Sequence, residues 1–254
     1  MIHPGLVSVT FRQLEPSAII DLVVRAGLVG IEWGGDIHVP HGDVNTASTV
    51  GMMTVEAGLQ VAAYGSYYRV GHTDEGLFEA SLETAYALGA PVIRVWPGKQ
   101  GSDTSDETYW DQVIADSQRI ADFAMQADIK IAYEFHAKTL TDTTASTQRL
   151  LEAVDHHNIV SLWQTPRYSV FDDNMIALDT VLPRLHNVHV FHWHQETGER
   201  HALSEGAELW QQYFAKLSTS GRDHFALLEF VRDDNPMQFL EDAATLNELL
   251  SASS

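Results

Sequence analysis

The sequence predicts a single-domain (β/α)₈ barrel that spans residues 1–254. Eight short runs rich in Val, Ile and aromatic residues alternate with segments of helical periodicity. These units recur at intervals of about 25–40 residues, which is typical of a barrel of this kind. The 254 residues, 44% of them hydrophobic, are enough for one large core. A doubly wound open sheet is the alternative fold, but the first run is not followed by a Gly-rich phosphate-binding fingerprint.

The predicted strands are short and apolar, as strands buried on both faces of a parallel sheet are. They cover residues 6–11, 29–33, 60–64, 91–96, 130–135, 159–163, 187–191 and 225–230. The chain shows no linker, low-complexity segment or domain boundary between them.

Helices are predicted between these strands because apolar residues recur there at spacings of three and four. Such stripes lie at residues 19–28, 77–88, 113–123, 150–154, 209–217 and 239–250. Thr104-Ser105-Asp106-Glu107 has the spacing of a capping box before the fourth helix. Asn235-Pro236 places an N-cap residue before a proline at the start of the last helix. Gly27, Gly58 and Gly89 stand where helices are expected to end.

Composition excludes several classes of partner. The net charge is −20, from 15 Lys and Arg against 35 Asp and Glu, and a surface this acidic argues against binding to nucleic acid. No apolar run approaches the roughly 20 residues that span a bilayer, so no membrane partner is expected. The chain has no cysteine, which excludes disulfides and thiolate metal ligands. With no signal-peptide pattern, a cytoplasmic protein is expected. Assembly into a homo-oligomer stays open.

Four polar residues stand at the ends of the last four predicted strands. Glu134 and Glu229 each lie inside an otherwise apolar run, Gln164 follows the sixth run, and His189 belongs to the seventh. A carboxylate in such a place is costly unless it is paired or bound to a metal. Because barrel enzymes build their sites at the carboxyl ends of strands, these side chains are expected to meet at one rim.

The four residues predict a site for one divalent metal ion. Glu134 and Glu229 offer oxygen, His189 offers nitrogen and Gln164 offers a neutral amide oxygen. This set suits Mn, Mg, Co, Fe or Zn equally well. Two carboxylates balance the charge of the ion and leave it a stronger Lewis acid than three would.

The remaining rim residues predict a pocket for a sugar or a sugar derivative. Aromatic faces pack against the C–H faces of sugars, while charged groups hydrogen-bond to hydroxyls. Arg94 and Arg200 are of special interest, because a carbonyl or anionic oxygen needs positive charge on a protein this acidic. The predicted substrate-binding residues are Glu32, His38, Tyr64, Arg94, Trp96, His136, His192 and Arg200.

The whole chain resembles the xylose isomerase-like TIM-barrel superfamily, in its sugar phosphate isomerase/epimerase branch. The resemblance is carried by Gly30-Ile31-Glu32-Trp33, Tyr133-Glu134-Phe135-His136, Asn187-Val188-His189-Val190 and Leu228-Glu229-Phe230. It implies one divalent metal held by Glu, Asp, His and Glu on the last four strands. These roles carry over to Glu134, His189 and Glu229, whereas Gln164 replaces the family's Asp. The preference for His189 over His192 as a ligand also rests on the resemblance.

The predicted function is that of a metal-dependent sugar isomerase or epimerase. One of the two glutamates, Glu134 and Glu229, is expected to remove the proton beside a carbonyl that the metal polarises, and the other to return it. A lyase or dehydratase acting on a keto-sugar or an inositol derivative begins with the same step and is the first alternative. A sugar-binding barrel without catalysis is the second. An apurinic endonuclease of the same fold is disfavoured by the charge.

Overall fold

Eight parallel strands close into a barrel in the computed structural model, which describes residues 1–72, 75–166, 169–194 and 196–252. The strands follow the order β1-β10-β7-β6-β5-β4-β3-β2, so the sheet has no open edge and the doubly wound alternative is wrong. Their bounds are β1 Ile2–Val7, β2 Gly30–Gly34, β3 Gln60–Arg69, β4 Val92–Trp96, β5 Lys130–Glu134, β6 Ile159–Trp163, β7 Leu185–Val190 and β10 His224–Leu228.

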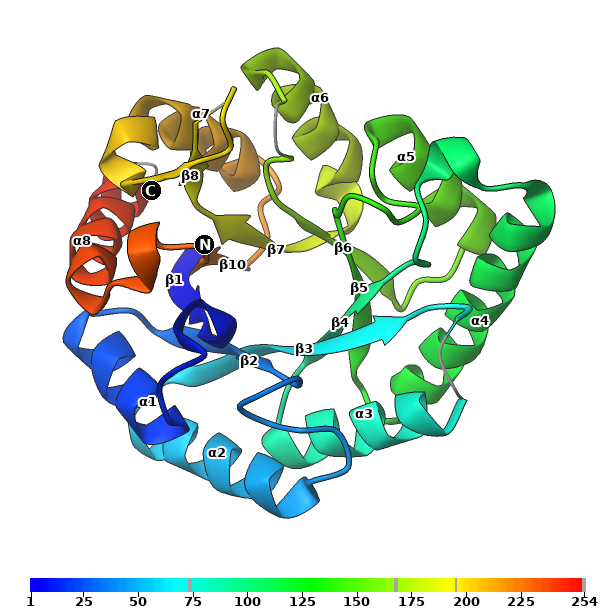
Figure 1. Ribbon diagram of the computed structural model, residues 1–254, viewed down its shortest axis with the longest axis horizontal. Coiled ribbons are helices and arrows are strands. Elements are labelled where there is room, and N and C mark those ends of the chain that lie inside the picture. Colours follow the sequence, from blue (N-terminus) through cyan, green and yellow to red (C-terminus); the bar gives the residue numbers. More distant parts are fainter. Residues whose placement is uncertain (73–74, 167–168, 195, 253–254) are drawn as a thin grey trace.

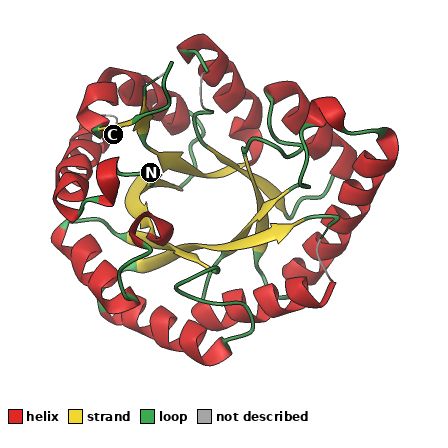
Figure 2. Ribbon diagram, viewed as in Figure 1, coloured by secondary structure: helices red, strands yellow, loops and turns green. Residues whose placement is uncertain are grey.

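Helices surround the barrel as an outer ring (Figures 1 and 2). They are α1 Pro16–Arg25, α2 Val44–Glu56, α3 Glu75–Leu88, α4 Glu107–Gln126, α5 Thr144–Val154, α6 Phe171–Val181, α7 Ala207–Ser218 and α8 Pro236–Ala252. Their apolar stripes pack on the outward faces of the strands and form one large core. No helix in the described part of the chain combines the length and the hydropathy needed to cross a membrane.

The first strand lies earlier than the sequence predicts. β1 covers Ile2–Val7, and Ser8–Phe11 forms a 3₁₀ turn instead of continuing the strand. Pro4 and Gly5 weaken the strand pattern, yet β1 is paired on both sides, with β10 and with β2. Gly5 permits this pairing, because a Cβ there would lie 2.6 Å from the carbonyl oxygen of Gly30.

The third strand is longer than predicted and is irregular near its end. The register between β3 and β4 shifts between Gly65 and Arg69. Tyr67, within this interval, has a φ of 57°. Such an irregularity re-aims the side chains of a strand, often beside a functional site.

The ends of the helices agree with most of the predicted signals. Gly27, Gly58 and Gly89 all have positive φ after their helices. The Asn235 side chain accepts a hydrogen bond from the Met237 backbone amide at 2.8 Å, as an N-cap does. The predicted capping box at 104–107 is wrong: Ser102–Thr104 forms a 3₁₀ turn, and Asp106 caps α4 by accepting from the Tyr109 amide.

Two short strands complete the carboxyl-terminal rim. β8 His192–Trp193 and β9 Arg200–His201 pair antiparallel in the connection between β7 and α7. His192 therefore stands on its own hairpin and not on the barrel strand that carries His189 (Figure 1).

Candidate functional site

Five ionisable side chains from five barrel strands form a continuous series, which we call the charged chain. Its order is Glu134, Arg94, Glu32, His189 and Glu229. Each member stands near the carboxyl end of its strand, which is where the sequence predicts the site. Every member is buried, so each charge depends on its neighbours in place of water.

Arg94 joins two of the carboxylates. Its Nε donates to Glu32 Oε1 at 2.6 Å, and its Nη1 donates to Glu134 Oε2. Burial opposes the charge of the guanidinium, but Glu134 and Glu32 more than offset this and raise the pKa of Arg94 further. Arg94 therefore stays charged and rigidly held.

His189 lies between the other pair of carboxylates. Its Nε2 is 3.0 Å from Glu32 Oε2, and its Nδ1 is 3.0 Å from Glu229 Oε2. Burial would lower the pKa of His189, yet the charges of Glu229 and Glu32 raise it to about 10. Burial would likewise raise the pKa of Glu32, but the charges of His189 and Arg94 lower it to about 2. Glu32 is thus an ionised carboxylate with no exposed surface.

Glu134 accepts more hydrogen bonds than the other two carboxylates of the charged chain. Besides Arg94, its Oε2 accepts from Trp96 Nε1 at 2.5 Å, and its Oε1 accepts from Gln164 Nε2 at 2.8 Å. Burial acts to raise the pKa of Glu134, and the Arg94 charge lowers it below the usual value. A carboxylate held in this way is a weak base.

The donor atoms fit a divalent metal in part. Within the described residues, no three His, Cys, Asp or Glu side chains are grouped so that they could hold a metal ion. Glu134, one of the four predicted ligands, is directed at Arg94 instead. The other three each have a buried atom that completes no hydrogen bond in the described part of the protein: Gln164 Oε1, His189 Nδ1 and Glu229 Oε2, the last two of which lie 3.0 Å apart as an ion pair.

These three atoms are of the kind that a metal site uses. Gln164 donates its amide hydrogens to Glu134 Oε1 and the Phe135 carbonyl, which leaves its Oε1 as the acceptor. His189 is protonated in this metal-free arrangement. If it lost the Nδ1 proton while Nε2 still donated to Glu32, the lone pair would lie on Nδ1, the usual arrangement for a metal-binding histidine. Gln164, His189 and Glu229 thus offer donor atoms of the kind that a divalent ion takes, whereas Glu134 is held by Arg94.

A cavity opens above the charged chain at the barrel mouth. One part, of about 260 Å³, is lined by Arg12, Tyr67, Arg94, Trp96, Glu134, His136, Arg200 and Glu229, among others. The adjoining part, of about 540 Å³, adds Gln164, Thr165, Phe191 and Trp193. The two parts share His136, Arg200 and Phe230, and we call them together the mouth cavity. Its size suits a small polyhydroxylated molecule.

Four of the predicted substrate-binding residues line the mouth cavity. These are Arg94, Trp96, His136 and Arg200. The His136 ring lies 5.0 Å from the Trp96 ring. Arg200 pairs with Asp234 at 2.6 Å, and its guanidinium lies over the Phe230 ring.

The other four are placed elsewhere. Glu32 is buried beneath the cavity. His38 Nδ1 contacts Ser8 Oγ at 2.9 Å, and the Tyr64 hydroxyl donates to the Val39 carbonyl at 2.9 Å. His38 and Tyr64 therefore hold the loop after β2. His192 lines a separate pocket beside the mouth cavity.

The sequence analysis did not single out Tyr67, which lies on β3 beyond the predicted strand 60–64. The Tyr67 ring meets Trp96 edge-on with centroids 5.0 Å apart, and its hydroxyl accepts from Arg12 at 2.9 Å. Tyr68 instead donates to Asp116 of α4 at 3.0 Å, outside the barrel. The strict alternation of side chains along a strand does not predict that Tyr67 faces Trp96, because this orientation results from the register shift after Gly65.

Comparisons with known proteins agree with this architecture. A family model described as "Xylose isomerase-like TIM barrel" matches residues 20–249. An inosose dehydratase from Geobacillus thermodenitrificans is 28% identical over 129 residues, which are 44% of this chain and 42% of that protein. The aligned segment thus spans less than half of that relative.

Solved structures are similar over nearly the whole chain. The "probable 3-DHS dehydratase AsbF" of Bacillus anthracis superposes with a TM-score of 0.83 at 19% identity, covering 97% of this chain and 99% of that one. An L-ribulose 3-epimerase superposes with a TM-score of 0.73 at 16% identity, covering 100% and 96%. At these identities, the likeness shows the fold alone.

Proposed function

The chain belongs to the xylose isomerase-like TIM-barrel family, and from this premise we propose that it removes a proton beside the carbonyl group of a sugar or sugar-derived ring. Proteins similar to it include dehydratases and an epimerase of such compounds. Both reactions can begin with this proton transfer, since a neighbouring carbonyl stabilises the resulting carbanion as an enolate. In this proposal the mouth cavity binds the substrate, and a carboxylate of the charged chain accepts the proton.

The observation that carries the proposal is the state of Glu229. Glu32 is buried between two cations, and Glu134 accepts hydrogen bonds on both oxygens. Glu229 forms one ion pair in the described structure, from Oε2 to His189 Nδ1 at 3.0 Å, and the residue lines the mouth cavity. Glu229 is therefore the carboxylate of the charged chain that is most available as a general base.

A divalent ion held by Gln164, His189 and Glu229, when bound, would polarise the substrate carbonyl and acidify the adjacent C–H bond. A carboxylate has two oxygens, so Glu229 can serve the ion with one and accept the proton with the other. Arg94 keeps Glu134 and Glu32 ionised and in place, while Trp96 and His136 form the wall against which the substrate packs.

Elimination of water suits this single available base. Glu229 takes the proton from the carbon beside the carbonyl, and the C–H electrons pass to the carbonyl oxygen. The electrons then return to form a C=C bond, the hydroxyl on the next carbon leaves, and Glu229 gives it the proton. One water is lost, the product is an unsaturated carbonyl compound, and Glu229 is ionised again.

Epimerisation or isomerisation is the second candidate. A second acid–base group on another strand favours it: Glu134 on β5 lines the same cavity as Glu229. For Glu134 to return the proton, it must first be released from Arg94 and Trp96. Dehydration needs no such rearrangement.

The test is incubation in D₂O with Mn²⁺ and a panel of carbonyl compounds that includes inososes, 3-DHS, D-allulose and L-ribulose. We expect deuterium beside the carbonyl, or loss of water, with at least one of them. Glu229→Gln should lower this rate by about 10²–10⁴-fold, the usual contribution of a general base. Exposed Glu248→Gln on α8 is the matched control and should keep the full rate.

Two results would count against the proposal. Full exchange in Glu229→Gln would remove this residue as the base. Absence of both exchange and stoichiometric divalent metal across the panel would favour the sugar-binding barrel without catalysis. Loss of water separates dehydration from epimerisation, which keeps the hydroxyl, inverts a centre and leaves one deuterium on the inverted carbon.

A further inference from the structure

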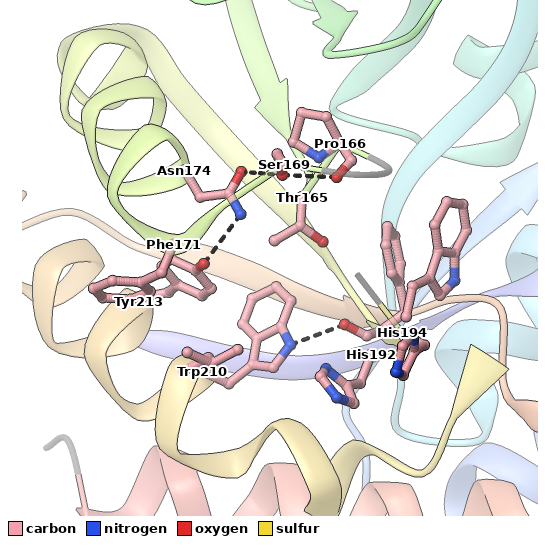
Figure 3. Close-up of a pocket in the computed structure, with 12 residues that line it drawn as sticks. Thr165, Pro166, Ser169, Phe171, Asn174, His192, His194, Trp210 and Tyr213 are labelled. Carbon is pink, nitrogen blue, oxygen red and sulfur yellow. Dashed lines mark hydrogen bonds between the residues drawn. The ribbon is translucent and has the colours of Figure 1, made fainter. Parts of the chain in front are cut away.

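A second pocket adjoins the mouth cavity between α6 and α7. It has a volume of about 320 Å³, and Figure 3 shows the residues that line it. Its walls come from the segment after β6, the start of α6, the β8 hairpin and α7, which contribute Thr165, Asn174, His192 and Trp210, among others. We call it the α6–α7 pocket.

The α6–α7 pocket and the mouth cavity have a common wall. Thr165, Pro166, Phe191 and Trp193 line both of them. Thr165 directly follows Gln164, which hydrogen-bonds to Glu134 of the charged chain. The mouth cavity and the α6–α7 pocket therefore meet along these four residues.

The lining of the α6–α7 pocket is aromatic, and its polar groups are held in place. Phe171, Trp210 and Tyr213 present rings, with the Trp210 and Tyr213 planes at 79°. Asn174 donates to the Tyr213 hydroxyl at 3.2 Å and accepts from Ser169 at 2.7 Å, as Figure 3 shows. These contacts preform the site, so little ordering is needed when a ligand binds.

The charge of the lining indicates the kind of ligand. Of the described residues that line the α6–α7 pocket, none is Asp, Glu, Lys or Arg. Burial, with His201 next in importance, lowers the pKa of His192, so its imidazole is neutral near pH 7 and can both donate and accept. Aromatic ring faces beside neutral hydrogen-bonding groups suit an uncharged sugar ring better than a phosphate or a carboxylate.

We propose that the α6–α7 pocket binds a second, uncharged sugar ring attached to the ring that reacts over the charged chain. The substrate class is then a glycoside whose reacting unit carries the carbonyl. This inference rests on the proposed function, and it adds to that function a requirement for a two-ring substrate.

The test compares the binding of one and two rings by saturation-transfer NMR and calorimetry. The probes are glucose, cellobiose, maltose and trehalose, with the protein loaded with diamagnetic Mg²⁺. We expect at least one disaccharide to bind tenfold or more tightly than glucose, with saturation transferred to both rings. Leu209→Trp on α7, which fills the α6–α7 pocket from its partly exposed side, should abolish this advantage and leave glucose binding unchanged.

Val55→Trp is the matched control, because Val55 is exposed on α2 and does not line the pocket. It should preserve the disaccharide advantage. The inference is overturned if no disaccharide binds more tightly than glucose, or if Leu209→Trp retains the advantage. An advantage shown by 4-nitrophenyl glucoside alone would overturn the choice of a sugar and assign the pocket to an aryl group.

Failure of this inference and failure of the proposed function give different results. Glu229→Gln should lose proton exchange while it keeps the disaccharide advantage. If the wild-type protein binds a disaccharide more tightly than glucose but exchanges no proton, the α6–α7 pocket is supported and the proposed enzymatic function is contradicted. If single sugars exchange a proton and no disaccharide binds more tightly than glucose, the proposed function is supported and the second sugar site is contradicted.

Discussion

Glu32 connects the two halves of the charged chain. Its two oxygens are shared between Arg94 and His189, and it has no exposed surface. A buried carboxylate is tolerated only when its partners compensate for the lost water, and the partners depend on it in the same way. Glu32 is not among the described residues that line the mouth cavity, so we expect it to act by positioning Arg94 and His189.

Glu32→Gln should therefore destabilise the protein by about 3–5 kcal/mol at pH 7, the usual effect of breaking a buried ion pair. The neutral amide keeps the volume of the side chain but leaves both cations undercompensated. Urea denaturation of the metal-free protein measures the difference. Glu248→Gln, at an exposed site, should change the free energy of unfolding by less than about 0.5 kcal/mol.

The difference in the free energy of unfolding between wild type and Glu32→Gln should decrease as the pH falls. The pKa of Glu32 falls from 4.5 to about 2 on folding, so its contribution is present above 4.5 and is lost as the pH falls toward 2. The stability gap between wild type and Glu32→Gln should narrow below pH 4.5. A gap that stays constant from pH 7 to pH 3 would contradict the assigned ion pairs.

At the scale of the elements, β3 shapes the site by its close approach to β4. Gly65 lies on β3 beside the guanidinium, and a Cβ there would be 2.5 Å from Arg94 Nη2 and 3.1 Å from Glu32 Oε1. The register shift after Gly65 then turns Tyr67 toward Trp96. One irregular strand end thus makes room for the cation and supplies an aromatic wall.

Gly65→Ala should displace Arg94 and weaken its bonds to Glu32 and Glu134. We expect the circular dichroism spectrum to be unchanged and the proton-exchange rate to fall at least tenfold. Gly58→Ala gives the contrast: its φ is 79°, and a Cβ there meets nothing within 4 Å. That variant should lose about 1–2 kcal/mol of stability and keep its rate. Equal rates in both variants would contradict the role of Gly65.

At the scale of the whole molecule, the net charge of −20 acts against the compact state. Like charges on the surface repel one another, while the charged chain is buried and is screened little by salt. Surface repulsion therefore dominates the response of stability to ionic strength.

The melting temperature should consequently rise as NaCl is increased from about 0.01 to 0.5 M, over which the Debye length falls from about 30 Å to a few ångströms. Thermal unfolding of metal-free protein measures the effect. A variant with exposed carboxylates on α8 reversed, Glu241→Lys and Glu248→Lys, should show a smaller rise. A melting temperature that falls with salt would mean that attractive surface pairs outweigh the repulsion.

How far the site could be predicted differs from residue to residue. Glu134, Gln164, His189 and Glu229 were placed together from their positions at strand ends, and they do meet at one rim. Their roles as ligands and bases stay predictions. The direction of Glu134 could not be foreseen, because Arg94 comes from a strand that is 40 residues away in the sequence.

The sequence by itself determined the barrel, since the alternation of apolar strands and amphipathic helices is a local property that short-range periodicity reveals. It also determined which strand ends carry charge. Only the tertiary structure decided that Glu32 and Arg94 hold the buried glutamates and His189. It also decided that Tyr67, and not Tyr68, lines the mouth cavity, and that a second pocket lies beside it. The physical reason is that a buried charge is stabilised by whichever partner the closure of the barrel brings within about 3 Å, and that distance is not written in any one segment.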